Sequence, residues 1–151
     1  ALGYAVVDEI LMEHFHNNWN QFSANYPDPL TAMQQLFLWK AESYRDEECF
    51  NGCPLNNLNQ EMAALDAGFH SRLEMVMEAI YQSIVTALEQ GQAQGYVRAD
   101  INPTRIAMFI MASYQGIMGA AKCMQAPELL LDLFGTLNEY IDTLRSQSTG
   151  S

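Results

Sequence analysis

Two of the three cysteines lie on either side of a turn that could carry reactive chemistry. Cys49 and Cys53 flank Asn51-Gly52, and Pro54 follows Cys53 directly. A helix that begins at Pro54 would place its positive end beside Cys53, favour the thiolate and raise the reactivity of that thiol. A small buried side chain that only fills space is the other interpretation of Cys53. The sequence leaves both interpretations open.

The remaining thiols and the imidazoles form no recognisable site. Cys49 and Cys123 are predicted to be inert, although Cys49 stands close enough in sequence to resolve an oxidised Cys53. The sequence has no C-x-x-C and no cysteine–histidine spacing of a zinc site, and His14 and His16 point to different sides of a helix. We therefore expect no metal and no cofactor, and the odd cysteine count favours a reducing, cytoplasmic compartment.

A set of aromatic and methionine side chains is a candidate lining for a ligand pocket. Apolar walls with a few tyrosine hydroxyls suit a flexible, hydrophobic small molecule, and methionine adapts to varied shapes. Ordinary core packing is the alternative for each residue taken singly. Cys53 is predicted to face the same pocket. The other members of the set are Phe15, Trp19, Phe37, Met62, Met77, Tyr81, Phe109 and Tyr114.

Charge excludes two classes of partner for this chain. It carries 7 basic and 18 acidic residues, a formal charge of −11, and the basic residues are scattered. Such a chain repels a phosphate backbone and has no cluster that could dock an anionic membrane surface. The sequence also offers no spaced catalytic residues and no glycine-rich phosphate loop, so we expect no enzyme.

Helical periodicity accounts for almost the whole chain. Pro27 ends a first amphipathic helix, and Asp28-Pro29 and Asn102-Pro103 are cap-plus-proline helix starts. The sequence therefore predicts an all-α domain of six helices. The first is expected to end at Asn25, and the others to span Pro29 to Glu48, Pro54 to Leu65, Phe69 to between Gly91 and Gly95, Thr104 to about Met124 and Ala126 to Leu144.

The two ends of the chain carry separate expectations. Ala1 to Tyr4 lead into helical periodicity with no capping residue, as though the sequence began partway along a helix. Residues 146–151 are small and polar and are predicted to form a disordered tail. We expect one domain over residues 1–145, with a further N-terminal part missing from this chain.

Three short segments carry a family resemblance. Gly52-Cys53-Pro54-Leu55 opens a short helix after two longer ones, and the residues from Gly91 to Pro103 connect two long helices. Tyr114-Gln115-Gly116 and Ala120-Ala121-Lys122 stand late in the fifth helix. In their order and spacing, these segments resemble the C-terminal ligand-binding and dimerisation domain of TetR/AcrR-family transcriptional regulators. The resemblance covers nearly the full chain.

This resemblance implies a ligand-responsive transcriptional repressor. Its fold would be a TetR-type regulatory domain that forms a homodimer, with the last two helices packed against a partner's as a four-helix bundle. The earlier helices would enclose a small-molecule pocket, and operator DNA would be read only by an N-terminal helix-turn-helix unit absent here. A helical-bundle enzyme or carrier for a hydrophobic molecule is the alternative. The expected interface residues are Gly116, Gly119, Ala120, Leu130, Phe134, Leu137 and Ile141.

A NemR-like subgroup adds a narrower expectation. Members of that subgroup have a similar Gly-Cys element and a lysine late in the fifth helix, and they sense oxidants or electrophiles through the cysteine. Cys53 and Lys122 stand at the matching places here. The resemblance thus implies a small hydrophobic or electrophilic effector, with Cys53 and Lys122 as a redox- or electrophile-sensing pair.

Overall fold

The computed structural model describes residues 2–62 and 64–147, and in these residues it confirms the all-helical prediction. The segments α1, η1 and α2 follow one another without a break and make one long first helix, so the architecture has six helices. No strand occurs in the described residues, where Val97 and Arg145 form an isolated bridge. The segments are α1 (Leu2–Ala5), the π-helical η1 (Val6–Leu11), α2 (Met12–Asn25), α3 (Pro29–Tyr44), α4 (Pro54–Met62), α5 (Ala67–Ala93), α6 (Pro103–Met124) and α7 (Leu129–Asp142).

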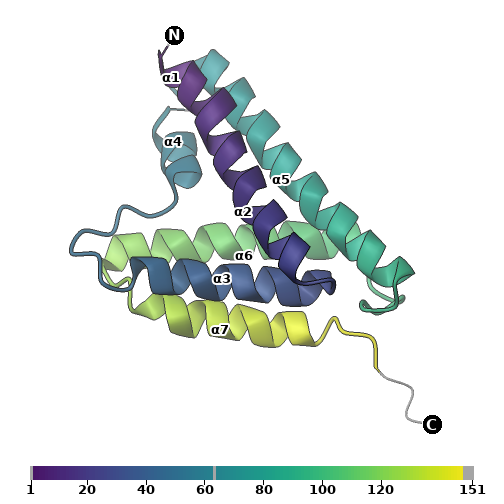
Figure 1. Cartoon of the computed structure of the whole chain (residues 1–151). Helices are drawn as coiled ribbons and strands as arrows, with labels where there is room; N and C mark the ends of the chain where they lie inside the picture. The colour runs from purple at the N-terminus through teal and green to yellow at the C-terminus, as the bar shows by residue number, and fades with distance from the viewer. Residues whose placement is uncertain (1, 63, 148–151) are drawn as a thin grey trace.

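The helices form two groups (Figure 1). The first helix and α5 run diagonally side by side, while α6, α3 and α7 lie roughly parallel to one another beneath them. The short α4 lies at the side, near the start of the first helix. In the described residues, no helix is both long and apolar enough to span a membrane.

The predicted caps begin the helices where the sequence indicated. The Asp28 carboxylate accepts a hydrogen bond from the Leu30 amide at 2.9 Å, and Pro29 occupies the first turn of α3. The Asn102 side chain accepts from the amides of Thr104 and Arg105 at the start of α6. These side chains satisfy amides that lack a partner within the helix.

Several helix boundaries differ from the prediction, and two of them have a clear physical reason. The interruption predicted at Asp66 is confirmed, but α5 begins at Ala67 rather than Phe69, because the Asp66 carboxylate caps it by accepting from the Gly68 amide at 2.7 Å. The second predicted helix ends at Tyr44 rather than Glu48. Three consecutive acids at 46–48 oppose the negative end of the helix and disfavour its continuation.

The four α7 residues that the sequence analysis assigns to a dimer interface lie inside this chain. Leu130, Phe134 and Ile141 are fully buried within this chain, and Leu137 is 5% exposed. Phe134 stacks on Phe37 of α3 with ring centroids 5.3 Å apart. Little of their surface is free, because both α3 and α6 contact α7. Their assignment to a dimer interface stays a prediction.

A polar seam joins the end of α7 to the start of α3. The Arg145 guanidinium forms an ion pair with Asp28, and it donates to Thr31 Oγ1 at 3.1 Å and to Gln34 Oε1 at 2.5 Å. Gln34 in turn donates to Asp142 Oδ1 at 2.7 Å, and Arg145 also donates to that oxygen at 3.1 Å. Every charged group of this seam has a partner within the chain.

Candidate ligand cavity

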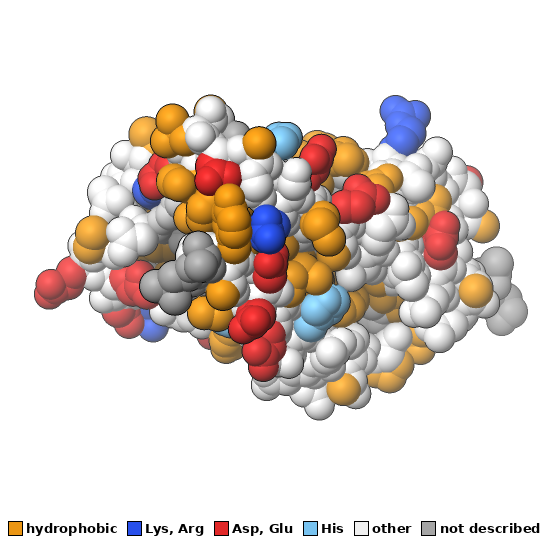
Figure 2. Space-filling view, turned by 90° about the horizontal axis from the view of Figure 1, so that it is seen from above, with side chains coloured by type: hydrophobic (Ala, Val, Ile, Leu, Met, Phe, Trp, Pro, Cys, Tyr) orange, Lys and Arg blue, Asp and Glu red, His pale blue; other side chains and the backbone are white. Residues whose placement is uncertain are grey.

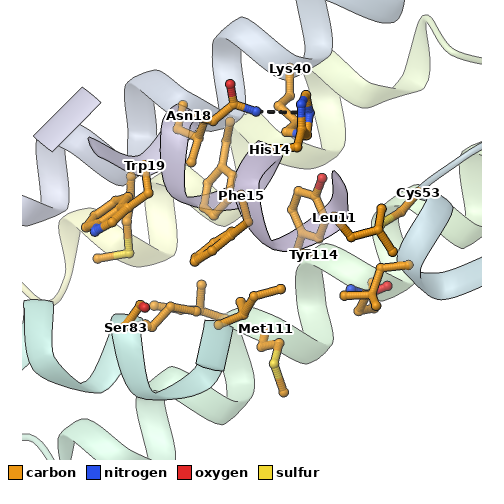
Figure 3. A pocket seen from close by; sticks show the side chains of 18 of the residues that line it. Leu11, His14, Phe15, Asn18, Trp19, Lys40, Cys53, Ser83, Met111 and Tyr114 are labelled. Atoms are coloured by element: carbon orange, nitrogen blue, oxygen red, sulfur yellow. Dashed lines mark hydrogen bonds between the residues drawn. The ribbon is translucent and has the colours of Figure 1, made fainter. Parts of the chain in front are cut away.

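A cavity of about 160 Å³ lies beneath the first helix. Its walls come from the first helix, α3, α5 and α6, and the residues around the start of α4 close one end. An apolar cavity of about 150 Å³ is large enough to hold benzene. Figure 3 shows Trp19 near one end of the cavity and Cys53 near the other. The space therefore suits a molecule with the bulk of one ring.

Five of the nine predicted pocket residues line this cavity, namely Phe15, Trp19, Phe37, Cys53 and Tyr114. They come from four different parts of the chain, so the tertiary fold brings them together. The Tyr114 ring is held by its neighbours, because its centroid lies 5.9 Å from that of Phe37 and 5.7 Å from that of Phe134. Phe37 and Tyr114 thus form a rigid wall.

The other four predicted pocket residues lie elsewhere. Met62 ends α4, and Met77 packs against the core without reaching the cavity. The Tyr81 hydroxyl donates to the Thr104 carbonyl oxygen at 3.4 Å. Phe109 is 51% exposed on α6, with its ring 4.9 Å from that of Tyr140. Aromatic or thioether character alone therefore did not identify which face of a helix meets the cavity.

Lys40 is a charged cavity residue that the sequence analysis missed. Its side chain is half-buried and lines the cavity, with Nζ 6.0 Å from the centroid of the Tyr114 ring. Burial holds the pKa of Lys40 below its ordinary value, and nearby Cys53 opposes this shift. A signal was present, since Met33, Phe37, Lys40 and Tyr44 follow one another at helical spacing in a single apolar stripe.

Three polar groups of the cavity wall, His14, Tyr44 and Tyr114, are neutral at ordinary pH. Burial, together with the neighbouring Lys40 charge, lowers the pKa of His14, and the Asn18 side chain is hydrogen-bonded to His14 Nε2 at 3.1 Å (Figure 3). Burial raises the pKa of Tyr44, and it raises the pKa of Tyr114 well above its ordinary value. Both tyrosines therefore remain protonated and can donate a hydrogen bond.

Gln115, another polar residue of the cavity wall, lacks a hydrogen-bond donor to its side-chain oxygen. The Oε1 atom of Gln115 is buried and has no hydrogen-bond partner. A buried carbonyl oxygen without a donor costs about 1–3 kcal/mol. No Asp or Glu occurs among the described residues that line the cavity, and no three His, Cys, Asp or Glu side chains in that part of the chain gather as metal ligands would.

Cys53 is buried, whereas Cys49 and Cys123 are exposed. The Cys53 carbonyl accepts from the Asn57 amide at 3.0 Å, which starts the first turn of α4. Lys122 donates to Asn57 Oδ1 at 2.9 Å, and its stem covers Gly52, where an added Cβ would lie 3.1 Å from Lys122 Cδ. Lys122 does not line the cavity, so the lysine that shares it with Cys53 is Lys40.

A second, more polar cleft adjoins the cavity. It lies between the end of the first helix and α5, and Trp19 and Ser83 line both spaces. The indole of Trp19 therefore stands between the apolar cavity and this surface cleft. A ligand that entered through the cleft would have to pass Trp19.

Comparison with known proteins agrees with this architecture. A family model described as "Tetracyclin repressor-like, C-terminal domain" matches residues 29–133. The transcriptional regulator AcuR of Cereibacter sphaeroides is 29% identical over 113 residues, which cover 74% of this chain and 52% of AcuR. The HTH-type transcriptional repressor DhaR of a Mycobacterium species is 25% identical over 112 residues, covering 72% of this chain and 54% of DhaR.

The fold is also similar to that of a solved regulator. The crystal structure of the reduced form of Escherichia coli NemR superposes with a TM-score of 0.81 at 14% identity, covering 99% of this chain and 76% of NemR. The present chain spans about half the length of the curated relatives that it matches.

Proposed function

The chain belongs to the family of tetracyclin repressor-like C-terminal domains, and on that premise we propose that it is the effector-binding and dimerisation part of a transcriptional repressor. The names of its relatives support this proposal, because one is a transcriptional regulator and another a transcriptional repressor. The cavity is the main observation behind this proposal, since a regulator of this kind needs a binding site for a small molecule among helices that can move.

The proposed effector is a small, largely apolar molecule. Phe15, Trp19, Phe37, Cys53 and Tyr114 are the proposed contacts, because they line the cavity from different helices. A molecule held by all of them would tie the first helix to α3 and α6. Cys53 is buried, and thiols in such surroundings react slowly, so we assign it to packing against the effector rather than to covalent sensing.

The proposed dimer uses the exposed side of α6. Met108 and Phe109 are 49% and 51% exposed and are neighbours on α6. An added Cβ at Gly116 would meet no atom within 4 Å, so a partner helix could approach closely there. Ala120 is exposed farther along the same helix. This apolar stripe would be covered by the same stripe of a second copy.

Transmission from the cavity is proposed to run through the first helix. Leu11, Phe15 and Trp19 from that helix line the cavity. At its start, Tyr4 donates to the Asp66 carboxylate at 2.9 Å, and Asp8 pairs with Arg72 of α5 at 2.9 Å. A ligand that moves the first helix would therefore move its N-terminal end relative to α5.

Operator DNA is proposed to be read by another part of the protein. The formal charge of this chain is −11, and acidic side chains are spread over the face of the molecule seen from above, with hydrophobic ones exposed between them (Figure 2). Such a surface repels phosphates. A helix-turn-helix unit joined to the start of the first helix, as the resemblance implies, would respond to its movement.

A ligand screen with a blocked cavity tests the proposal. Small apolar compounds should raise the melting temperature of the chain, because they bind the folded state. An Ile80→Trp variant fills the cavity and should abolish the increase, whereas Met75→Trp, on the same helix but 72% exposed, should retain it. An absence of stabilising compounds, or equal responses of the two variants, would contradict an effector site at this cavity.

A further inference from the structure

One part of the cavity wall gathers hydrogen-bond donors that have no acceptor. Lys40, Tyr44, Cys53 and Tyr114 all line the cavity, and Cys53 is close enough to each of the others to influence it electrostatically. The Lys40 ammonium lies 6.0 Å from the centroid of the Tyr114 ring. Within the described residues, none of these four side chains donates a hydrogen bond or joins an ion pair.

Among the described residues that line the cavity, Lys40 has no acidic neighbour, although the chain as a whole is acidic. The sequence has 18 acidic residues against 7 basic ones, yet no carboxylate lies among the described residues of the cavity wall. A half-buried ammonium without an anion is unfavourable, because it has lost water and gained no opposite charge. The other lysine, Lys122, has its partner in Asn57. The arrangement at Lys40 is therefore incomplete unless an anion arrives from outside.

The remaining cavity residues restrict the polarity and the size of the non-charged part of that anion. Ile80, Ile84, Ile110 and Met111 are apolar and lie on α5 and α6, the helices that form the wall beneath the first helix. The volume of about 160 Å³ leaves room for one ring or a short alkyl chain. The amide of Gln115, whose oxygen lacks a partner, offers a second polar contact in the same wall.

We propose that the cavity binds a small amphipathic carboxylic acid, whose carboxylate accepts hydrogen bonds from Lys40, Tyr114 and Tyr44 while its ring or alkyl body fills the apolar space. This inference rests on the proposed effector-binding function and names the chemical class of the effector. Hydrogen bonds from a cation to a carboxylate are stronger than neutral ones, so the head group dominates selectivity. A neutral molecule of the same shape would leave the donors of the wall without an anion.

Matched acids and amides test this inference. Benzoate and hexanoate are titrated into the chain by calorimetry at pH 7.5, alongside benzamide and hexanamide, which have the same bodies without the charge. At least one acid should bind ten or more times more tightly than its amide. Lys40→Met should reduce that ratio to near one, while Arg45→Met, which removes one positive charge from an exposed site outside the cavity, should preserve it.

A tyrosine pair gives a second measurement that does not depend on charge removal. Tyr114→Phe keeps the ring and removes the donor, and it should weaken acid binding about tenfold, as expected for a lost hydrogen bond to a charged group. Tyr81→Phe, outside the cavity, should leave acid binding unchanged. Circular dichroism confirms that each variant is folded before the titrations are compared.

The outcomes separate this inference from the proposed function. Equal binding of acid and amide, or an acid preference that survives Lys40→Met, would overturn the carboxylic-acid inference and leave an effector site in place. Failure of both acids to bind at 20 mM would also overturn it, even where the compound screen finds a neutral ligand. Failure of that whole screen would overturn the proposed function itself.

Discussion

Two cations lie along α3, and they differ in whether acidic side chains surround them. Arg145 meets the start of the helix, where Asp28, Thr31 and Gln34 all bond to its guanidinium. Lys40 lies near the end of the same helix and faces a cavity whose described lining holds no carboxylate. Within the described residues, the fold thus gives Arg145 anionic partners and gives Lys40 none.

This difference separates a structural polar group from one that is free for a ligand. A satisfied network fixes how helices pack, since removing one member leaves the others buried and unpaired. An unsatisfied polar group lowers stability, and proteins retain such groups where binding uses them. The contrast predicts that substitutions at the two places change stability in opposite directions.

The largest effect is expected at the seam. Arg145→Met should lower the free energy of unfolding by about 2–3 kcal/mol, because Asp28 and Gln34 would lose their charged partner while remaining largely buried. Urea denaturation measures the change, with Arg45→Met as a control for loss of an exposed charge. A loss of less than about 1 kcal/mol would mean that Arg145 forms only ordinary surface ion pairs. The proposed difference between Arg145 and Lys40 would then be contradicted.

Lys40→Met should have the opposite sign. Replacing an unpaired, half-buried ammonium with an apolar side chain of similar length should raise the free energy of unfolding by about 1 kcal/mol. The same denaturation experiment measures it in the absence of ligand. If the variant were instead less stable than the parent, Lys40 would have a structural partner and could not be compared with Arg145 in this way.

A pair of uncharged substitutions sharpens the comparison. Thr31→Val removes a hydroxyl that accepts from Arg145 and donates to Asp28, and it should lower the free energy of unfolding by about 1 kcal/mol. Gln115→Leu removes the unpaired buried oxygen of the cavity wall and should leave stability unchanged or raise it by about 0.5 kcal/mol. Thermal unfolding of both variants checks the two signs, and two losses of equal size would contradict the distinction.

The smallest effect is a dependence on pH. The pKa of Lys40 is held below its ordinary value of 10.5, so between the two values the folded chain binds fewer protons than the unfolded chain. The parent should therefore gain stability relative to Lys40→Met as pH rises through that range, and the difference should be constant at lower pH. Parallel pH profiles over the whole range would show that Lys40 is solvated like a surface lysine.

Much of the fold could be predicted from local sequence. Asp28-Pro29 and Asn102-Pro103 began helices as expected, because capping depends on a few adjacent residues. The break expected from Asp66 is confirmed, but the next helix begins at Ala67 rather than Phe69, because the Asp66 side chain caps it. The π-helical turn at Val6–Leu11 had no recognisable signal in the sequence.

The cavity could be predicted only in part. Phe15, Trp19, Phe37, Cys53 and Tyr114 line it as expected, but chemical type gave no way to separate them from Tyr81 or Phe109. Both of those residues belong to apolar helix faces, and helix rotation decides which face meets the cavity. Lys40 was missed because a cation in an apolar stripe is readily interpreted as a solvated side chain.

By itself, the sequence determined the all-helical class, most helix starts, the acidic surface and the family resemblance, because each depends on composition or on residues close together in the chain. The tertiary structure decided the rest. Packing of α3 against α7 buried Phe134, while Phe109 of α6 remained half-exposed. The same packing set Lys40 beside Tyr114, which lies 74 residues away in the chain, and long-range placement of this kind follows from how the helices pack together.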